Sequence, residues 1–329
     1  MRATALVTGA NGFLGNNLVR ELLADGYKVI TLIRKKSDDA ILKRLSCEII
    51  RVDSYAYENI ESVVSKSDYV IHCASKTDQW DLNYQNYYQA NVESTKALLK
   101  ACKKHDINKF VLVSTTNCFT AGNLSNPGTE NSEFMPFFQH SGYAFSKYEA
   151  QKYVLKEIED HQFPAVIIAP SFMLGAYDTK PSSGALAEYV FKKKVLFYPT
   201  KAGKSFVSVL NVCGAIINAL KSDISGEAYI ASGVNMTLKD YFKNVASLLG
   251  EKRILIPIPA KFTLFLLALF RSIFRHKKLY RIEVNLKGFF IENYFSNAKA
   301  KMDLMMEDTD MEKEIKATIQ WLTEDRYKI

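Results

Sequence analysis

The sequence predicts an α/β protein with a doubly wound parallel sheet and a smaller, interleaved C-terminal lobe. Two observations predict it. Short β-branched runs alternate with amphipathic helical stretches through the first half of the chain, and this alternation stops after Pro170. A chain of 329 residues, of which 48% are hydrophobic, is long enough to bury the core that such a fold needs.

Six strands and four crossover helices are expected before Pro170. The strands are predicted at residues 3–7, 28–33, 48–52, 69–73, 110–114 and 165–168. Apolar residues recur at helical spacing in residues 14–25, 60–66, 87–105 and 143–161. Residues 1–170 are therefore expected to form the sheet domain.

The rest of the chain is expected to divide between the two lobes. Strand-like runs at 206–210 and 227–230 predict segments near 206–233 that return to the sheet domain. Residues 171–205 and 234–329 are expected to form mainly the second lobe, because glycines and prolines punctuate loops and helices there.

Charge and cysteine content narrow the classes of protein. The chain has 43 basic and 35 acidic residues, a net charge of +8, but the basic residues are spread along it, so a solvated surface is favoured over a nucleic-acid site. Five cysteines without CxxC spacing predict reduced thiols and no metal site. The first strand is expected to begin too early to leave room for a signal peptide, so the interpretation is cytoplasmic.

Residues 262–278 leave two possibilities open. The stretch 263–270 is apolar throughout and is followed by basic residues, a pattern found in helices that lie in a membrane interface. It is far shorter than the roughly 20 residues that a membrane span requires. A buried helix of the second lobe is the favoured interpretation, and contact with a membrane surface is the alternative.

Three glycines at a spacing of three lie between the first strand and the first helix. Gly9, Gly12 and Gly15 permit a tight turn, close approach of a pyrophosphate and close helix–strand packing, with the anion at the positive end of the helix. This context predicts a dinucleotide-binding Rossmann domain. The expected cofactor contacts of the loop come from Gly9, Asn11, Gly12, Phe13 and Leu14.

The end of the second strand indicates which nicotinamide cofactor binds. An acidic residue there would bind a ribose 2′-hydroxyl, whereas this strand ends in Arg34 and two lysines, which favours NADP(H) over NAD. Asp53 is placed to accept a hydrogen bond from the adenine amino group, although an Asp at this point is also a common helix cap. Ala74 and Ser75, after the fourth strand, are expected to line the ribose next to the nicotinamide.

Tyr143 and Lys147 are expected to lie one helical turn apart on one face, as an acid–base pair. A nearby cation and an oxidised nicotinamide would favour the phenolate. Three hydroxyl residues, Ser114 to Thr116, end the fifth strand, where a hydroxyl can hold the oxygen that the tyrosine protonates. The glycine loop, these hydroxyls and the YxxxK pair together describe one site.

These motifs resemble those of an extended short-chain dehydrogenase/reductase over nearly the whole chain. The resemblance implies that Thr116 is the catalytic hydroxyl, that Tyr143 is the acid–base, and that Lys147 binds the ribose while lowering the tyrosine pKa. It also implies a supporting role for Asn91. In relatives, the helices that match residues 87–105 and 143–161 form a two-fold bundle, so a homodimer is expected.

Within that family the chain is most similar to the dihydroflavonol-reductase-like branch, which reduces ketones and aldehydes with NADPH. The segment 169–175 resembles the one that cradles the nicotinamide, with Pro170 and Phe172 near the ring. Nucleotide-sugar enzymes usually carry an arginine before this proline, where the chain has Ala169. Lysines that could still face a sugar diphosphate are Lys180, Lys192, Lys193, Lys194, Lys201 and Lys204.

The leading hypothesis is an NADPH-dependent reductase of a ketone or aldehyde on a fairly apolar small molecule. The alternative is a nucleotide-sugar epimerase or dehydratase with tightly bound NAD. A minor alternative is a regulator that binds NADP without turnover, but such relatives typically lose the YxxxK pair, which this chain keeps. Neither the substrate nor the physiological direction follows from the sequence.

Overall fold

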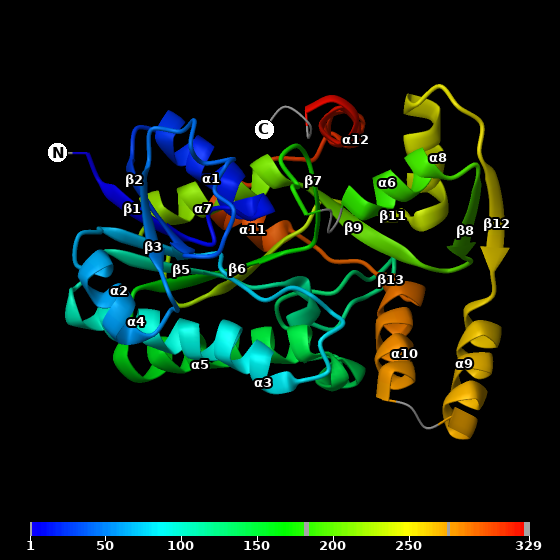
Figure 1. The fold of residues 1–329 in the computed structure, drawn as a ribbon, viewed down its shortest axis with the longest axis horizontal. Helices are drawn as coiled ribbons and strands as arrows, with labels where there is room; N and C mark the ends of the chain where they lie inside the picture. The colour runs from blue at the N-terminus through cyan, green and yellow to red at the C-terminus, as the bar shows by residue number, and fades with distance from the viewer. Residues whose placement is uncertain (1, 181–183, 275–276, 326–329) are drawn as a thin grey trace.

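The computed structural model describes residues 2–180, 184–274 and 277–325 and has a seven-stranded parallel sheet at its centre (Figure 1). The strand order is β10-β6-β5-β4-β1-β2-β3, and every neighbouring pair is parallel. The strands are β1 (Thr4–Thr8), β2 (Lys28–Arg34), β3 (Glu48–Val52), β4 (Tyr69–His72), β5 (Lys109–Val113), β6 (Ala165–Pro170) and β10 (Ala228–Ala231). The predicted doubly wound sheet is confirmed.

Helices cover both faces of the sheet (Figure 1). One face carries α1 (Phe13–Ala24), α7 (Val209–Lys221) and α11 (Ala298–Leu304), and the other carries α2 (Tyr57–Val64), α4 (Ser94–Lys104) and α5 (Gly142–His161). Each face has its own apolar core, one including Leu18 and Ile216, the other Leu98 and Val154. Because both faces are buried, the central strands are apolar without alternation.

The order of the strands determines where a ligand binds. The chain places β2 on one side of β1 and β4 on the other, so the loops that follow β1 and β4 diverge and open a crevice. Gly9 follows β1, Cys73 follows β4, and Ser114 follows β5 at this same edge. Residues far apart in sequence thus converge there.

The second lobe is built on two small sheets. The four-stranded sheet contains β7 (Phe172–Leu174), β9 (Gly203–Ser208), β11 (Val234–Thr237) and β13 (Glu292–Asn293), and the two-stranded sheet contains β8 (Val195–Pro199) and β12 (Ile254–Ile258). Three helices pack with them: α6 (Gly184–Lys192), α8 (Leu238–Leu248) and α12 (Met311–Gln320).

The two strand-like runs expected to return to the sheet domain have different locations. The run at 227–230 supplies β10, which pairs with β6 in the main sheet. The run at 206–210 ends β9, which pairs with β7 and β11 in the second lobe. The chain returns to the sheet domain just after β9, through α7, which packs on α1.

A helical hairpin of α9 (Ala260–Phe274) and α10 (Lys277–Phe290) stands at one side of the second lobe (Figure 1). The expectation that residues 263–270 are buried is wrong: Phe265 is 64% exposed and Phe270 is 54% exposed. The reason is that α9 packs against α10 and leaves its other face uncovered. Within the described residues no helix is long and apolar enough to cross a membrane. Arg275 lies outside the described residues.

Candidate active site

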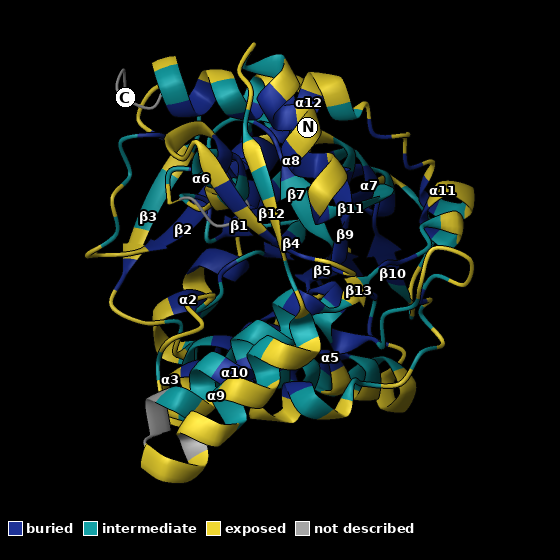
Figure 2. Cartoon of the chain, turned by 90° about the vertical axis from the view of Figure 1, so that its right-hand side faces the viewer, coloured by how far each residue is buried: buried dark blue, intermediate teal, exposed yellow. Residues whose placement is uncertain are grey.

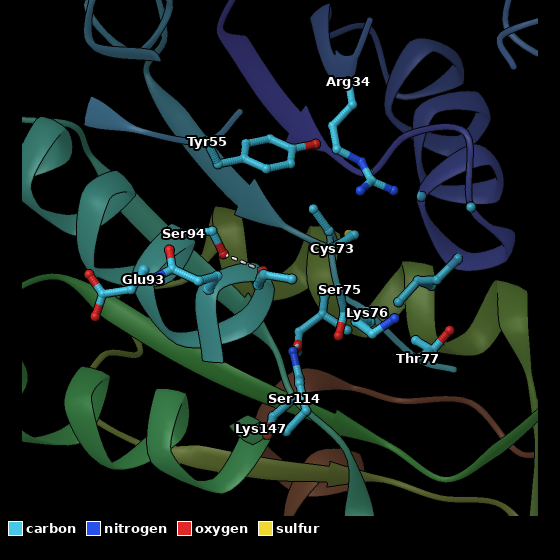
Figure 3. Close-up of a pocket in the computed structure, with 18 of the residues that line it drawn as sticks. Arg34, Tyr55, Cys73, Ser75, Lys76, Thr77, Glu93, Ser94, Ser114 and Lys147 are labelled. Carbon is cyan, nitrogen blue, oxygen red and sulfur yellow. Dashed lines mark hydrogen bonds between the residues drawn. The ribbon is translucent and has the colours of Figure 1, made fainter. Parts of the chain in front are cut away.

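A cavity of about 1490 Å³ runs along the carboxyl edge of the main sheet. Figure 3 shows Arg34 at one end and Lys147 at the other, with Cys73 and Ser75 between them. The cavity is thus long enough to connect the end of β2 with the start of α5, and it passes the ends of β1, β4 and β5. An extended ligand fits this shape.

The glycine loop forms one wall of this cavity. Gly9 has φ +65°, and a Cβ there would lie 2.6 Å from backbone atoms of Ala74, so no larger residue fits. A Cβ on Gly15 would lie 2.3 Å from the carbonyl oxygen of Gly9. No side chain caps the first turn of α1, and Asn11, Gly12, Phe13 and Leu14 all line the cavity. The Gly12 amide donates to the Gly9 carbonyl over 3.0 Å, so the neighbouring amides of Asn11, Phe13 and Leu14 are the ones available to a diphosphate.

Arg34 lines the cavity at the end of β2 and forms no ion pair with an acid in the described part of the chain. Lys35 behaves differently, because its Nζ lies 2.7 Å from Asp53 Oδ2 at the surface. Asp53 also lines the cavity. Its carboxylate can therefore either pair with Lys35 or accept the expected hydrogen bond from an adenine amino group. Arg34, unlike Lys35, is therefore available to meet a phosphate.

Tyr55 forms the floor beside Arg34 and had no recognisable signal in the sequence. Its hydroxyl donates to the Leu32 carbonyl over 3.0 Å, and burial raises the pKa of this phenol to about 12. The ring therefore stays neutral and offers an apolar surface next to the guanidinium (Figure 3). Such a ring suits stacking with an adenine or its ribose.

Asn91 holds the loop that follows β4. Its Oδ1 accepts from the Lys76 amide over 2.7 Å and from the Ser75 hydroxyl over 3.0 Å. Its Nδ2 donates to the Ser146 hydroxyl over 2.8 Å. Asn91 lies in a π-helical turn, Tyr88–Glu93, and is fully buried. It therefore ties the Ser75 loop to α5, which carries Tyr143 and Lys147, and it does not line the cavity.

Thr115, and not Thr116, meets the phenol of Tyr143. Its side chain forms a hydrogen bond with Tyr143 and lines the cavity, whereas Thr116 is buried outside the lining. The cause is local: the chain turns into a 3₁₀ helix, Thr116–Cys118, directly after Thr115, and this turn carries Thr116 away from the cavity. The position expected for Thr116 is thus filled by Thr115.

The environment of Tyr143 differs from the expected one. Burial raises the pKa of this phenol to about 12, and the hydrogen bond with Thr115 opposes the rise only in part. Without cofactor, Tyr143 is therefore a neutral phenol and not a phenolate. A protonated phenol is the form required to deliver a proton to a carbonyl oxygen.

Lys147 is buried at the base of the site. Its Nζ donates to the Val113 carbonyl over 2.5 Å, at the end of β5. Burial lowers the pKa of Lys147 to about 8, because the ammonium loses its hydration in the protein interior. The ammonium is charged at neutral pH and loses its proton as the pH rises through this value.

This pKa predicts the alkaline behaviour of the enzyme. We expect kcat/KM for NADPH, which reports groups of the free enzyme, to be constant near neutrality and to fall about tenfold per pH unit above the Lys147 pKa of about 8. Tyr143 cannot cause this fall, because its pKa of about 12 keeps it protonated. Lys147→Arg is the control, since its guanidinium stays charged and should remove the alkaline limb. A wild-type profile that is flat to pH 10 contradicts the assignment.

The end of β6 and the segment after it present some residues to the cavity and turn others away. Pro170, Ser171 and Met173 line it, whereas Phe172 turns into the second lobe and packs edge-on against Phe206, with ring centroids 5.3 Å apart. The expected contact of Phe172 with the nicotinamide is therefore not seen, because neighbouring residues of β7 point to opposite sides. Ser171 Oγ is buried without a hydrogen-bond partner, so it can serve a polar ligand group.

The comparisons with known proteins agree with this geometry. The model of the NAD-dependent epimerase/dehydratase family matches residues 5–231. Sterol demethylase protein B of Methylococcus capsulatus is 28% identical over 262 residues, 78% of this chain and 78% of that protein. A ketoreductase of Stigmatella aurantiaca, named for a farnesylated dihydroquinoline oxide, is 26% identical and covers 75% of this chain and 73% of its own. Relatives also include a dihydroflavonol 4-reductase-like protein.

Among solved structures, the crystal structure of gox2253 superimposes with a TM-score of 0.86 at 24% identity. The match covers 98% of this chain and 99% of the other. At this identity the likeness concerns the fold, and it extends through the second lobe.

Proposed function

The chain belongs to the NAD-dependent epimerase/dehydratase family and is an NAD(P)-dependent enzyme of the extended short-chain dehydrogenase/reductase type, and from this premise we propose that it reduces a ketone or aldehyde on an apolar substrate with NADPH. The observation that carries the proposal is the pairing of a free Arg34 at one end of the cavity with a protonated Tyr143 at the other. The first favours a phosphorylated cofactor, and the second favours reduction.

The residues around Tyr143 have complementary tasks. When bound, the reduced nicotinamide supplies a hydride to the carbonyl carbon. Thr115 donates a hydrogen bond to the carbonyl oxygen and polarises it, and Tyr143 gives that oxygen its proton, so the C=O bond becomes an alcohol. Lys147 holds the ribose hydroxyls and stabilises the phenolate that remains. Ser171 offers a hydrogen bond to the carboxamide of the nicotinamide.

The fit of the cavity to a dinucleotide supports the cofactor. Gly9 and Gly15 let the loop fold closely against Ala74 and onto itself, which leaves the start of α1 open, and the first turn of α1 has no side-chain cap. Ser75 lies between the glycine loop and Lys147, where the ribose next to the nicotinamide would lie (Figure 3). These features support a dinucleotide that extends from Arg34 to Lys147.

Arg34→Ala should change the choice of cofactor. We expect it to raise KM for NADPH by roughly 10- to 100-fold, the cost of one charge-assisted phosphate contact, and to leave KM for NADH nearly unchanged. Lys35→Ala is the matched control, because Lys35 is a neighbouring cation that pairs with Asp53 and does not line the cavity. Equal effects of the two substitutions, or a wild-type preference for NADH, would refute the assignment of NADPH.

The nucleotide-sugar alternative has less support in the second lobe. Of the six lysines that could face a diphosphate, all of which lie in described ranges, only Lys180 lines the cavity. Lys192 pairs with Glu188 over 2.6 Å, and Lys204 is buried, with its Nζ donating to the Gly288 carbonyl. Identification of the cofactor released from purified protein separates the two functions: tightly held NAD indicates an epimerase or dehydratase, and exchangeable NADP a reductase.

A homodimer also remains part of the proposal. The helices α4 and α5 cover one face of the sheet and pack on one another. Sedimentation velocity of the purified protein tests the oligomeric state.

A further inference from the structure

The outer side of α9 carries a stripe of large apolar residues, here called the α9 face. Their spacing follows helical turns, so they lie on one side, and each is between 37% and 64% exposed. The α9 face consists of Phe262, Phe265, Leu266, Leu269, Phe270, Ile273 and Phe274. Single exposed apolar residues are ordinary, but a contiguous row of seven marks a surface that something covers.

The neighbouring sheet extends this apolar surface. In the parallel pair of β8 and β12, Val195 lies beside Ile254 and Phe197 beside Ile256, and all four are exposed. Figure 2 views the molecule from this side, with α9 and β12 toward the reader and exposed residues along both. Both elements belong to the same lobe and follow one another in the chain.

All charged side chains in the segment of the sequence that contains α9 are positive. From Lys252 to Ile282 the sequence contains eight basic residues and no acidic one. The basic residues are Lys252, Arg253, Lys261, Arg271, Arg275, Lys277, Lys278 and Arg281. The side chain of Arg253 is buried and pairs with Glu251, so it adds no charge to this surface. Apolar side chains combined with a purely cationic segment complement a bilayer, whose apolar interior lies below anionic headgroups.

We propose that the α9 face binds an anionic lipid surface and lies in its plane. The 15 residues of α9 span about 22 Å, less than the roughly 30 Å of a hydrocarbon core, so the helix rests in the interface. Its phenylalanines and leucines enter the acyl boundary, and the net positive charge of the segment is attracted to the lipid phosphates.

Charge argues against a second copy of the chain as the occupant. A two-fold contact through the α9 face would bring the same cationic segment of both copies together, fourteen basic residues with no acid from that segment, since each copy contributes seven besides the buried Arg253. Like charges across an apolar contact oppose association. A lipid surface supplies the opposite charge.

The hairpin is also tied to the rim of the active-site cavity. Asn285 of α10 donates from Nδ2 to the Gln79 carbonyl over 3.3 Å, and the adjacent Thr77 and Asp78 line the cavity. Docking would therefore bring the cavity rim to the lipid, where an apolar substrate concentrates. This extension rests on the proposed function, whereas lipid binding does not.

The test is co-sedimentation of the full-length protein with unilamellar vesicles. The probe is phosphatidylcholine mixed with phosphatidylglycerol, and pure phosphatidylcholine is the comparison. We expect binding to the anionic vesicles that weakens as NaCl is raised to about 0.5 M. Phe265→Glu with Phe270→Glu should lower the partition coefficient roughly 100-fold, because two buried aromatic anchors are lost. The thermal unfolding midpoint verifies that the variant is folded.

Leu124→Glu with Met302→Glu provides the matched control, since both residues are exposed and lie outside the hairpin. This variant should bind vesicles like the wild type. The proposal is overturned if the wild type does not bind anionic vesicles, or if the two double variants bind equally. It is also overturned if the α9 face mediates self-association in sedimentation and vesicles are not bound. Vesicle binding without carbonyl reduction would leave lipid docking intact and refute only the proposed function.

Discussion

Tyr143→Phe is expected to lower kcat for carbonyl reduction by roughly 10³-fold, within the 10²–10⁴-fold range of a positioned general acid. The substitution removes only the hydroxyl, so the ring keeps its place in the cavity and the fold is retained. The phenol is protonated in the free protein, because burial raises its pKa to about 12.

The measurement is steady-state consumption of NADPH, together with NADPH binding by fluorescence. Tyr148→Phe is the control: it lies on the same helix, stacks on Phe134 with ring centroids 4.3 Å apart, and does not line the cavity. We expect this control to keep near wild-type turnover. If Tyr143→Phe retains more than about a tenth of the turnover, Tyr143 is not the acid.

Thr115→Val should lower kcat by roughly 10²-fold, because it removes the hydrogen bond that holds the reacting oxygen. Thr116→Val, one residue along the chain, should change kcat by less than about threefold, since Thr116 lies outside the cavity lining. The two substitutions have the same shape change and the same loss of one hydroxyl.

Thr115 also accepts a hydrogen bond from the Asn117 amide over 3.3 Å, so a structural effect must be separated from a chemical one. Thr115→Ser keeps the hydroxyl and should restore most of the turnover. If Thr116→Val loses more turnover than Thr115→Val, then Thr116 is the catalytic hydroxyl, as the family resemblance first implied.

The sheet domain could be predicted from the sequence because most of its strands, the edge strand β3 excepted, are buried on both faces. Such strands appear as short apolar runs between turns, and their predicted ends differ from the observed ones by at most two residues. The glycine loop was equally clear, since Gly9 and Gly15 meet steric limits that only glycine satisfies. Buried strands and a sterically restricted loop both limit which residues fit, and these limits are visible in the sequence.

Features that depend on tertiary packing were not predictable. Ser114, Thr115 and Thr116 are chemically alike, and only the 3₁₀ turn after Thr115 decides which hydroxyl faces Tyr143. Likewise, Phe172 and its neighbours alternate between cavity and core, and the register of β7 selects Ser171 and Met173 for the cavity. A shift of one residue in the strand register would turn each of these side chains to the opposite face. The spacing of residues in the sequence does not determine that register.

The apolar segment 263–270 shows a further limit of sequence patterns. A helix that is apolar on most sides has the same composition whether it is buried or exposed. Only the packing of α9 against α10 shows that one face is left uncovered. The exposed fractions in that face, and not its hydrophobicity, indicate a surface with a partner.

The central claim is that this chain transfers a hydride from NADPH to an external carbonyl. The direct test incubates the purified enzyme with each of the two stereoisomers of 4-deuterated NADPH and a panel of large apolar ketones, followed by mass spectrometry of the products. The account predicts an alcohol that carries one deuterium at the former carbonyl carbon, from one stereoisomer only. If no ketone takes up deuterium while the protein holds NAD that does not exchange and interconverts nucleotide sugars, the account is contradicted.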